Sequence, residues 1–364
     1  MKTACRAYRN HNRRRTAACR ATRRKRRAPE AGRSVAQMTG RRLLPFIAGV
    51  LLLAAAFQTI AQPAGQPVRT VGLLVPGTLQ TQTDSFVLMS ELRRLGYREP
   101  ENLRLVRREA VGKFERLPSL ARELVDARVE VIVAFNTPGV RAAIDATREI
   151  PIVMTQVGDP VGSGFVANLA RPGGNVTGVS NRVAELAPKR MEVLRETLPF
   201  AKRIAVLFNP ADPVTKPQVQ HLEALRASIG VDFRFFPARR LDDFAETFGE
   251  VLAWQAHAAM WLNGQQQLFQ AMTIKLATQH KLPVMVGSAG DVRAGGLISY
   301  TASAPETYRR TAALVDLILK GKKPGDIPVE QPTRFELAIN LKAAKALGLT
   351  IPSSMLLRAD HVVE

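Results

Sequence analysis

Short apolar runs alternate along the chain with segments in which apolar residues recur at helical spacing. A run such as Ile204–Phe208 is continuously apolar, which is typical of a strand covered on both faces in a parallel sheet. The first half of the chain contains predicted strands at Thr70–Val75, Leu103–Arg107, Val129–Phe135 and Ile152–Thr155. The second half contains them at Arg203–Phe208, Asp232–Phe236, Ala258–Leu262, Val284–Val286 and Leu297–Tyr300.

Between these runs, apolar stripes at three- and four-residue spacing predict amphipathic helices. The repeated alternation of strand and helix predicts an α/β fold with a doubly wound parallel sheet, because crossovers between parallel strands are right-handed. A further helix is predicted at Pro305–Lys320, and a run from Phe335 to Leu349 closes the chain. The stripes are Leu117, Leu120, Ala121, Leu124 and Val125, then Met191, Leu194 and Leu198, and then Ala312, Val315 and Leu319.

The alternation runs from Thr70 to Thr155 and restarts from Arg203 to Val286, so roughly 300 residues are better divided into two domains than placed in one sheet. The segment Asn175–Asn181 lies between the halves and reads as an extended crossing strand. We therefore expect two lobes joined by more than one strand. The first lobe would comprise residues 69–178 plus 302–325, and the second residues 179–301 plus 326–364.

The N-terminal region has the three parts of a secretory signal. Arg41 and Arg42 precede the 15 uncharged apolar residues Leu43–Phe57, and small residues stand before a cleavage point after Ala61. Fifteen helical residues rise roughly 22 Å, which is short of the about 30 Å of a bilayer core. The expectation is a cleaved signal peptide at 38–61 and a linker at 62–68. No cysteine follows the apolar run, which excludes a lipoprotein.

The net charge of +21 is concentrated at the N-terminus, where residues 1–42 hold 15 basic residues and one acidic residue. Residues 1–37 are too basic and polar to pack, so they are interpreted as a disordered extension or as sequence upstream of a true start at Met38. A nucleic-acid-binding arm is the alternative. Both cysteines, Cys5 and Cys19, lie in this extension, so the exported chain would have neither a disulfide nor a thiolate.

Catalytic motifs are missing from the sequence: it has no HExxH, no GxSxG and no P-loop, and its carboxylates are scattered through amphipathic helices. The polar residues that stand out come where predicted strands end. Helix starts at such strand ends bind anionic groups, and open α/β sheets bind ligands at that edge. Each residue could instead be an ordinary helix cap or turn. The candidates are Thr78, Asn136, Thr137, Asp159, Asn209, Asn263 and Ser288.

Several long stretches are specific beyond a generic α/β pattern. They are IPIVMTQVGDPVGSGFVANLARPGGNVTGVS, LAPKRMEVLRETLP, RIAVLFNP and GGLISYTASAPETYRRTAALVDLILKGKKPGDIPVEQPTRFELAINLKAAKALGLTIP. On these stretches the chain resembles ABC transporter substrate-binding proteins of the group related to tryptophan- and tyrosine-binding members. The resemblance implies a type I periplasmic binding fold, with two Rossmann-like lobes, three hinge crossings and a ligand held between the lobes. It also places the candidate residues, together with Asn181, on loops that face the cleft.

The sequence thus favours a periplasmic solute-binding protein that closes on a small polar or anionic, amino-acid-like solute. Its expected partners are that solute and an ABC permease with its ATPase in the inner membrane, with no nucleic acid, metal or cofactor, and the protein is expected to be a monomer. A sensory subunit that presents its ligand-bound form to a membrane receptor is the alternative. A DNA-binding regulator would need a helix-turn-helix before residue 60, and an enzyme would need an assembled nucleophile or base.

Overall fold

The computed structural model describes residues 67–364 except 78–84, 213, 241 and 265–266. The predicted basic extension, the signal peptide, nearly all of the linker and the candidate Thr78 lie outside these residues. The described residues form one compact unit. Within it, the chain is organised around two separate sheets.

The first sheet has five parallel strands in the order β2-β1-β3-β4-β5. All four strands predicted for the first lobe are confirmed, and the predicted crossing strand forms the edge strand β5. The strands are β1 (Arg69–Val75), β2 (Leu103–Glu109), β3 (Val131–Phe135), β4 (Ile152–Val157) and β5 (Val176–Ser180).

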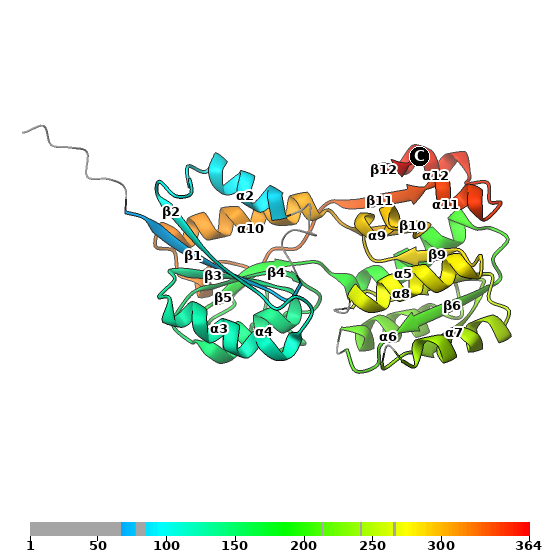
Figure 1. Ribbon diagram of the computed structural model, residues 1–364, viewed down its shortest axis with the longest axis horizontal. Coiled ribbons are helices and arrows are strands. Elements are labelled where there is room, and N and C mark those ends of the chain that lie inside the picture. The colour runs from blue at the N-terminus through cyan, green and yellow to red at the C-terminus, as the bar shows by residue number, and fades with distance from the viewer. Residues whose placement is uncertain (1–66, 78–84, 213, 241, 265–266) are drawn as a thin grey trace, which may run out of the picture. The chain divides into compact units, whose positions relative to one another are not determined.

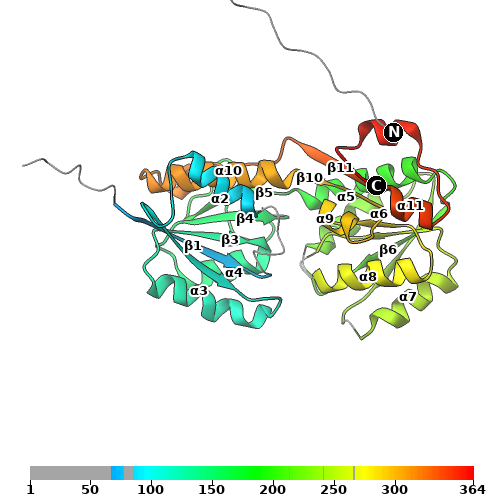
Figure 2. The same ribbon diagram turned by 45° about the horizontal axis from the view of Figure 1, so that its top comes forward.

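Helices cover both faces of the first sheet (Figures 1 and 2). On one face, α2 (Ser85–Arg94) and α10 (Ala304–Leu319) pack on the apolar side chains of β1 and β3. On the other face, α3 (Leu117–Asp126) and α4 (Asn136–Ala146) pack on the apolar side chains of the same sheet. The short 3-10 helix η1 (Phe114–Arg116) precedes α3. Burial on both faces explains why the central strands β1 and β3 read as nearly continuous apolar runs.

The second sheet has seven strands in the order β12-β11-β10-β9-β8-β6-β7. The five strands predicted for this lobe are confirmed as β6 (Arg203–Phe208), β7 (Asp232–Pro237), β8 (Ala258–Trp261), β9 (Val284–Val286) and β10 (Ile298–Ala302). One face is covered by α5 (Val183–Thr197), α6 (Thr215–Leu225), α11 (Leu341–Ala346) and α12 (Ser353–Arg358). The other is covered by α7 (Phe244–Ala253), α8 (Gln267–Gln279) and α9 (Ala289–Arg293).

The expectation of a wholly parallel sheet is wrong at the end of the chain. The run from Phe335 divides into β11 (Phe335–Asn340) and α11, and β11 pairs antiparallel with β10. The physical reason is the direction of entry: β11 follows a connection from the first lobe, so no crossover helix returns the chain to the start of the sheet. A final strand, β12 (His361–Val363), pairs parallel with β11.

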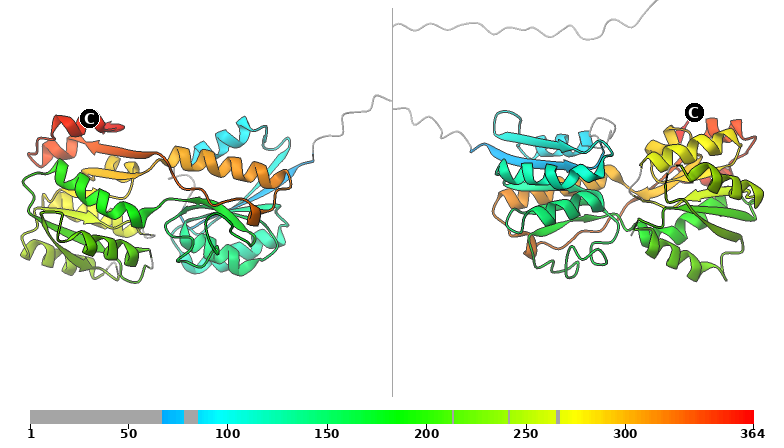
Figure 3. Two further views of the ribbon diagram at one scale, coloured as in Figure 1. Left: turned by 180° about the vertical axis from the view of Figure 1, so that it is seen from behind. Right: turned by 60° about the horizontal axis from the view of Figure 1, so that its bottom comes forward.

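In the part of the chain that the structure describes, three connections run between the two sheets, at 181–182, at Ser303 and at 331–334 (Figure 3). The exact lobe boundaries stay a prediction. Around them, β5 extends to Ser180, the 3-10 helix η2 (Pro324–Asp326) follows α10, and Ile327 and Val329 pack with the core of the first sheet. Glu330 then bridges to Val179 before the chain leaves for β11.

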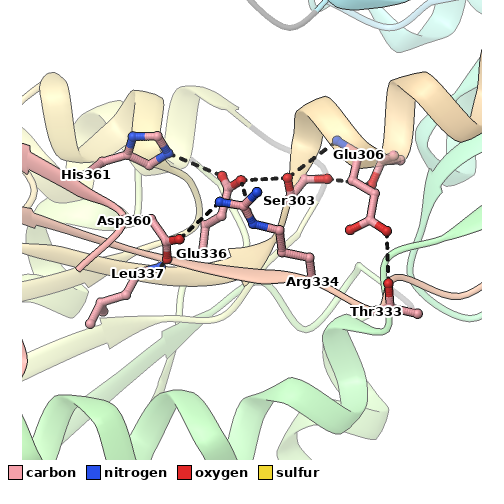
Figure 4. Close-up of polar contacts among 9 residues, drawn as sticks. Ser303, Glu306, Thr333, Arg334, Glu336, Leu337, Asp360 and His361 are labelled. Carbon is pink, nitrogen blue, oxygen red and sulfur yellow. Dashed lines mark hydrogen bonds and ion pairs between the residues drawn. The ribbon is translucent and has the colours of Figure 1, made fainter. Parts of the chain in front are cut away.

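Two of these connections are tied together by hydrogen bonds (Figure 4). The Ser303 amide donates to the Arg334 carbonyl at 3.0 Å, and the Ser303 hydroxyl donates to the buried Glu336 carboxylate at 2.6 Å. The Thr333 hydroxyl donates to Glu306 at 2.9 Å. On its other side Glu336 lies 3.3 Å from the His361 ring. These bonds fix the two connections against each other.

Candidate functional site

Each sheet has a strand at which the order of assembly changes side, so that the next strands along the chain are added on its opposite edge. In the first sheet the chain passes from β1 to β2 and then returns to the other side of β1 as β3; in the second it does the same around β6, with β7 and β8. Ligands of open α/β sheets bind at the carboxyl ends of the strands next to this point. Asn136 and Thr137 directly follow β3. Asn209 follows β6, and Asn263 comes two residues after β8.

The first-lobe edge offers mainly backbone groups. Asn136 begins α4 with a left-handed backbone (φ 55°), a conformation that asparagine tolerates better than most residues. Phe135 holds the cap position, and no side chain caps the helix start. The first N–H groups of α4 are therefore available to a ligand, and the helix dipole favours a negative group there. Thr137 is buried in this first turn.

Asp159 lies after β4 and shapes its own loop. One carboxylate oxygen accepts a hydrogen bond from the Gly162 amide at 2.7 Å, which is the turn interpretation raised from the sequence. Arg141 of α4 donates to the Ser163 carbonyl, and its guanidinium stacks 4.6 Å from the Phe165 ring. The loop that carries Asp159 is thus attached to the helix that begins at Asn136.

The second-lobe edge contains buried amide groups with unused hydrogen-bonding capacity. Asn209 is 2% exposed, and its Oδ1 accepts from the Ala211 amide at 2.9 Å while its Nδ2 has no partner. Asn263 Oδ1 has no partner either. Gln218 Nε2 donates to the Asn263 carbonyl at 2.6 Å, which leaves Gln218 Oε1 unpaired. Such unpaired buried groups are rare in native proteins, so three near one strand edge mark it as a candidate site for a polar ligand or ordered water.

Asn181 lies in the connection between β5 of the first lobe and α5 of the second. Its Nδ2 donates to the Gln156 carbonyl at 3.3 Å, and its buried Oδ1 has no partner. Gly158, in the loop after β4, lies so close to the second lobe that a Cβ there would be 2.8 Å from Val183 and 2.9 Å from Val214. Val214 directly precedes α6, so the Asp159 loop of the first lobe lies beside the Asn209 edge of the second.

Ser288 serves as a helix cap. Its hydroxyl accepts from the Asp291 amide at 3.2 Å at the start of α9 and donates to the Asp291 carboxylate at 2.5 Å. Burial raises the pKa of Asp291, while the Ser288 hydrogen bonds and the charge of Arg190 oppose that rise. The structure thus places Ser288 at the second-lobe edge with its hydroxyl already engaged.

Two further residues of this edge, Arg190 and Gln218, were not among the sequence candidates. Arg190 is fully buried, and its Nη2 donates to the carbonyls of Trp261 and Val286, both at 3.0 Å. One sequence signal was present, because Arg190 falls on the same face of α5 as the buried Ala187, Met191 and Leu194. An arginine on the apolar stripe of an amphipathic helix needs buried partners.

Two negative observations apply to the part of the chain that the structure describes. No group of three or more histidine, cysteine or acidic side chains there is arranged to hold a metal ion. No helix there is long and apolar enough to cross a membrane.

Comparison with known proteins gives consistent results. A family model described as "ABC transporter substrate binding protein" matches residues 85–363. A tyrosine-binding protein of Clostridioides difficile is 28% identical over 265 residues, 70% of this chain and 73% of that protein. A Streptococcus pneumonia ABC domain solved with L-Trp has a TM-score of 0.74 at 25% identity, covering 81% of this chain and 99% of that one. A conserved domain protein of Vibrio cholerae has a TM-score of 0.73 at 29% identity over the same shares.

Proposed function

Since the chain belongs to the ABC transporter substrate-binding protein family, we propose that it captures an amino-acid-like solute in the periplasm and delivers it to an ABC permease and its ATPase. The resemblance read from the sequence is confirmed, and the two-lobed α/β fold is the type I periplasmic binding fold. The family binds solutes and does not catalyse a reaction. Export through a cleaved signal peptide at 38–61 and a monomeric state are parts of the same proposal.

The observation that carries the proposal is the set of unpaired polar groups at the two strand edges. Asn209 Nδ2 and the uncapped N–H groups at the start of α4 are donors, which suit a carboxylate. The unpaired oxygens of Asn181, Asn263 and Gln218 are acceptors, which suit an ammonium group. A zwitterion satisfies both sets, and an α-amino acid is the simplest solute with both charges close together.

The relatives support the same solute class. One of them is named for tyrosine, and a structural neighbour was solved with L-Trp. The acceptors and donors named above recognise only the main-chain part of an amino acid, so the side-chain preference of this protein is decided elsewhere in the site.

Hinge closure is the proposed mechanism of capture. A ligand shifts an open–closed equilibrium only if it binds the closed state more tightly, so it has to contact both lobes. Donors from α4 in the first lobe and amides after β6 and β8 in the second meet this requirement. The tied connections at Ser303 and Arg334 give the lobes a defined axis about which to rotate.

A thermal-shift screen of the purified protein against the L-amino acids and small carboxylates tests the proposal. A solute at a hundred times its Kd stabilises the folded state by about 2.7 kcal/mol, which gives a clear rise in Tm. We expect at least one amino acid to raise Tm and its decarboxylated amine to have no effect. If no compound of either class raises Tm, the proposal is wrong.

Sensing is the second candidate function, since a subunit that presents its closed form to a membrane receptor would bind solute in the same way. A pull-down with the solute-loaded protein separates the two. Recovery of a permease supports transport, and recovery of a receptor kinase supports sensing.

A further inference from the structure

Strands β8 and β9 separate at the edge where the solute is proposed to bind. Their ladder has two rungs, Ala259 with Val284 and Met260 with Met285. One residue later, Trp261 is paired on its β6 side with Leu207, and Val286 on its β10 side with Ser299. The ladder between β8 and β9 therefore ends just before the loops that carry Asn263 and Ser288.

Arg190 spans this gap. Its Nη2 donates to the carbonyls of both Trp261 and Val286 at 3.0 Å, so one guanidinium nitrogen joins the last residues of the two strands. The donor comes from α5, a helix that packs beneath the sheet, and not from either strand. The bond pair acts as one additional rung at the point where the strands part.

The stability of the core does not explain an arginine here. Arg190 is fully buried, and its Nε and Nη1 have no hydrogen-bond partner. Burial lowers its pKa to about 10, which reflects the cost of holding the charge away from water. An apolar side chain of similar volume avoids this cost, and such replacements of buried charges are often neutral or stabilising. The buried charge thus points to a role other than packing.

The two loops joined by Arg190 are packed tightly against each other. A Cβ on Gly287 would lie 3.0 Å from Asn263 Oδ1 and would also meet the Gln270 amide. Asn263 is two residues beyond Trp261, and Ser288 is two residues beyond Val286. A change in the separation of the strand ends would therefore move the unpaired Asn263 oxygen directly.

We propose that Arg190 is a positioning residue for solute binding: through the carbonyls of Trp261 and Val286 it holds the Asn263 and Ser288 loops at the separation that the bound solute requires. This inference rests on the proposed function, because the Asn263 oxygen that Arg190 positions is one of the groups assigned to the solute. Arg190 itself acts through the two strand ends and does not touch the solute.

Three variants test the proposal. Arg190→Met substitutes an unbranched apolar side chain and removes both hydrogen bonds, whereas Arg190→Lys keeps a cation that can still donate to the carbonyls. Met191→Ala is the matched control: it is the next residue of the same helix, is equally buried, and disturbs the core without reaching the strand ends through a polar contact. Thermal unfolding first verifies that each variant is folded.

The first readout is amide hydrogen exchange without solute. In Arg190→Met we expect at least tenfold faster exchange confined to residues 261–264 and 286–291, with partial recovery of protection in Arg190→Lys. Met191→Ala should raise exchange elsewhere in the second lobe and not selectively in these two segments. Unchanged exchange in Arg190→Met, or an increase spread evenly as in the control, overturns the positioning role.

The second readout is calorimetric affinity for the L-amino acid that raises the Tm of the parent protein most. We expect at least a tenfold loss in Arg190→Met and a change within about threefold in Arg190→Lys and Met191→Ala. Equal losses of affinity in Arg190→Met and Met191→Ala would show that Arg190 contributes only to core packing, which contradicts the positioning role. If the parent protein binds no amino acid, the proposed function fails, while the exchange measurement still decides whether Arg190 fixes the two loops.

Discussion

The two lobes contribute different kinds of group to the candidate site. In the first lobe, the start of α4 offers main-chain N–H groups, and Asp159 is engaged in its own turn. In the second lobe, Asn209 and Gln218 offer buried side-chain amides that are only partly bonded, and the half-buried Asn263 offers a buried oxygen without a partner. The first lobe thus offers the solute main-chain groups, whereas the second offers side chains. Side-chain substitutions should therefore weaken solute binding far more in the second lobe.

Asn209→Asp should have the largest effect. The substitution keeps the oxygen that accepts from the Ala211 amide and removes the unpaired donor, and it places a negative charge beside the proposed carboxylate. We expect affinity to fall about 100-fold, or ~2.7 kcal/mol, by calorimetry. The control is Asn168→Asp, the same change at a turn asparagine that accepts from the Arg171 amide at 2.7 Å. Equal affinities in both variants would remove Asn209 from the site.

Asn263→Ala should weaken binding less. It removes an oxygen that has no hydrogen-bond partner in the protein. The solute therefore loses one acceptor, while the protein loses no internal hydrogen bond of that oxygen. We expect about tenfold weaker binding, ~1.4 kcal/mol, and no loss of stability in urea titrations, because an unpaired buried group carries a desolvation cost. A variant that is destabilised yet binds normally would contradict this assignment.

Tyr97→Phe sharpens the comparison by separating stability from binding in the first lobe. Tyr97 donates to Asp316 at 2.9 Å, and burial together with this carboxylate raises the pKa of Tyr97 to about 12. Its contribution to stability is therefore complete below pH ~10 and is lost as the pH rises toward 12. We expect the variant to lose about 1 kcal/mol at pH 8, to lack this alkaline dependence, and to bind solute normally.

Among the substitutions at candidate site residues, Asn136→Gly should have the smallest effect on binding. Glycine adopts the left-handed backbone of residue 136 without strain, so the helix start keeps its geometry although the amide is gone. Affinity should stay within about threefold. Asn136→Ala has the same side-chain deletion but pays roughly 1 kcal/mol for the left-handed conformation. A large loss in Asn136→Gly would show that the first lobe also binds through side chains.

Most of the fold could be predicted from the sequence because its central strands are buried on both faces. Runs such as Val131–Phe135 and Ile204–Phe208 are apolar without interruption, and no helix period competes with them. β11 was missed for the opposite reason: Phe335–Asn340 contains Glu336 and continues without a turn signal into α11. Its direction depends on a connection from the other lobe, which no local pattern encodes.

The sequence could nominate candidate site residues only where a residue follows a predicted strand. Asn209 and Asn263 stand out because an apolar run precedes each of them, whereas Gln218 and Arg190 lie within helices, where polar side chains are normally solvated. Their role depends on which helix face meets which strand end, and this is set by tertiary packing. The same limit explains why Asp159 and Ser288 could not be distinguished in advance from a turn former and a cap.

Small-angle scattering of the purified protein, with and without the solute that raises its Tm, tests the central claim most directly. If backbone donors of the first lobe and amides of the second bind one solute, the radius of gyration must decrease when the protein is saturated with solute. The Asn209→Asp variant must then need a solute concentration that is higher in proportion to its loss of affinity to reach the same decrease. A saturating solute that leaves the radius of gyration unchanged would contradict closure of the two lobes on a shared ligand.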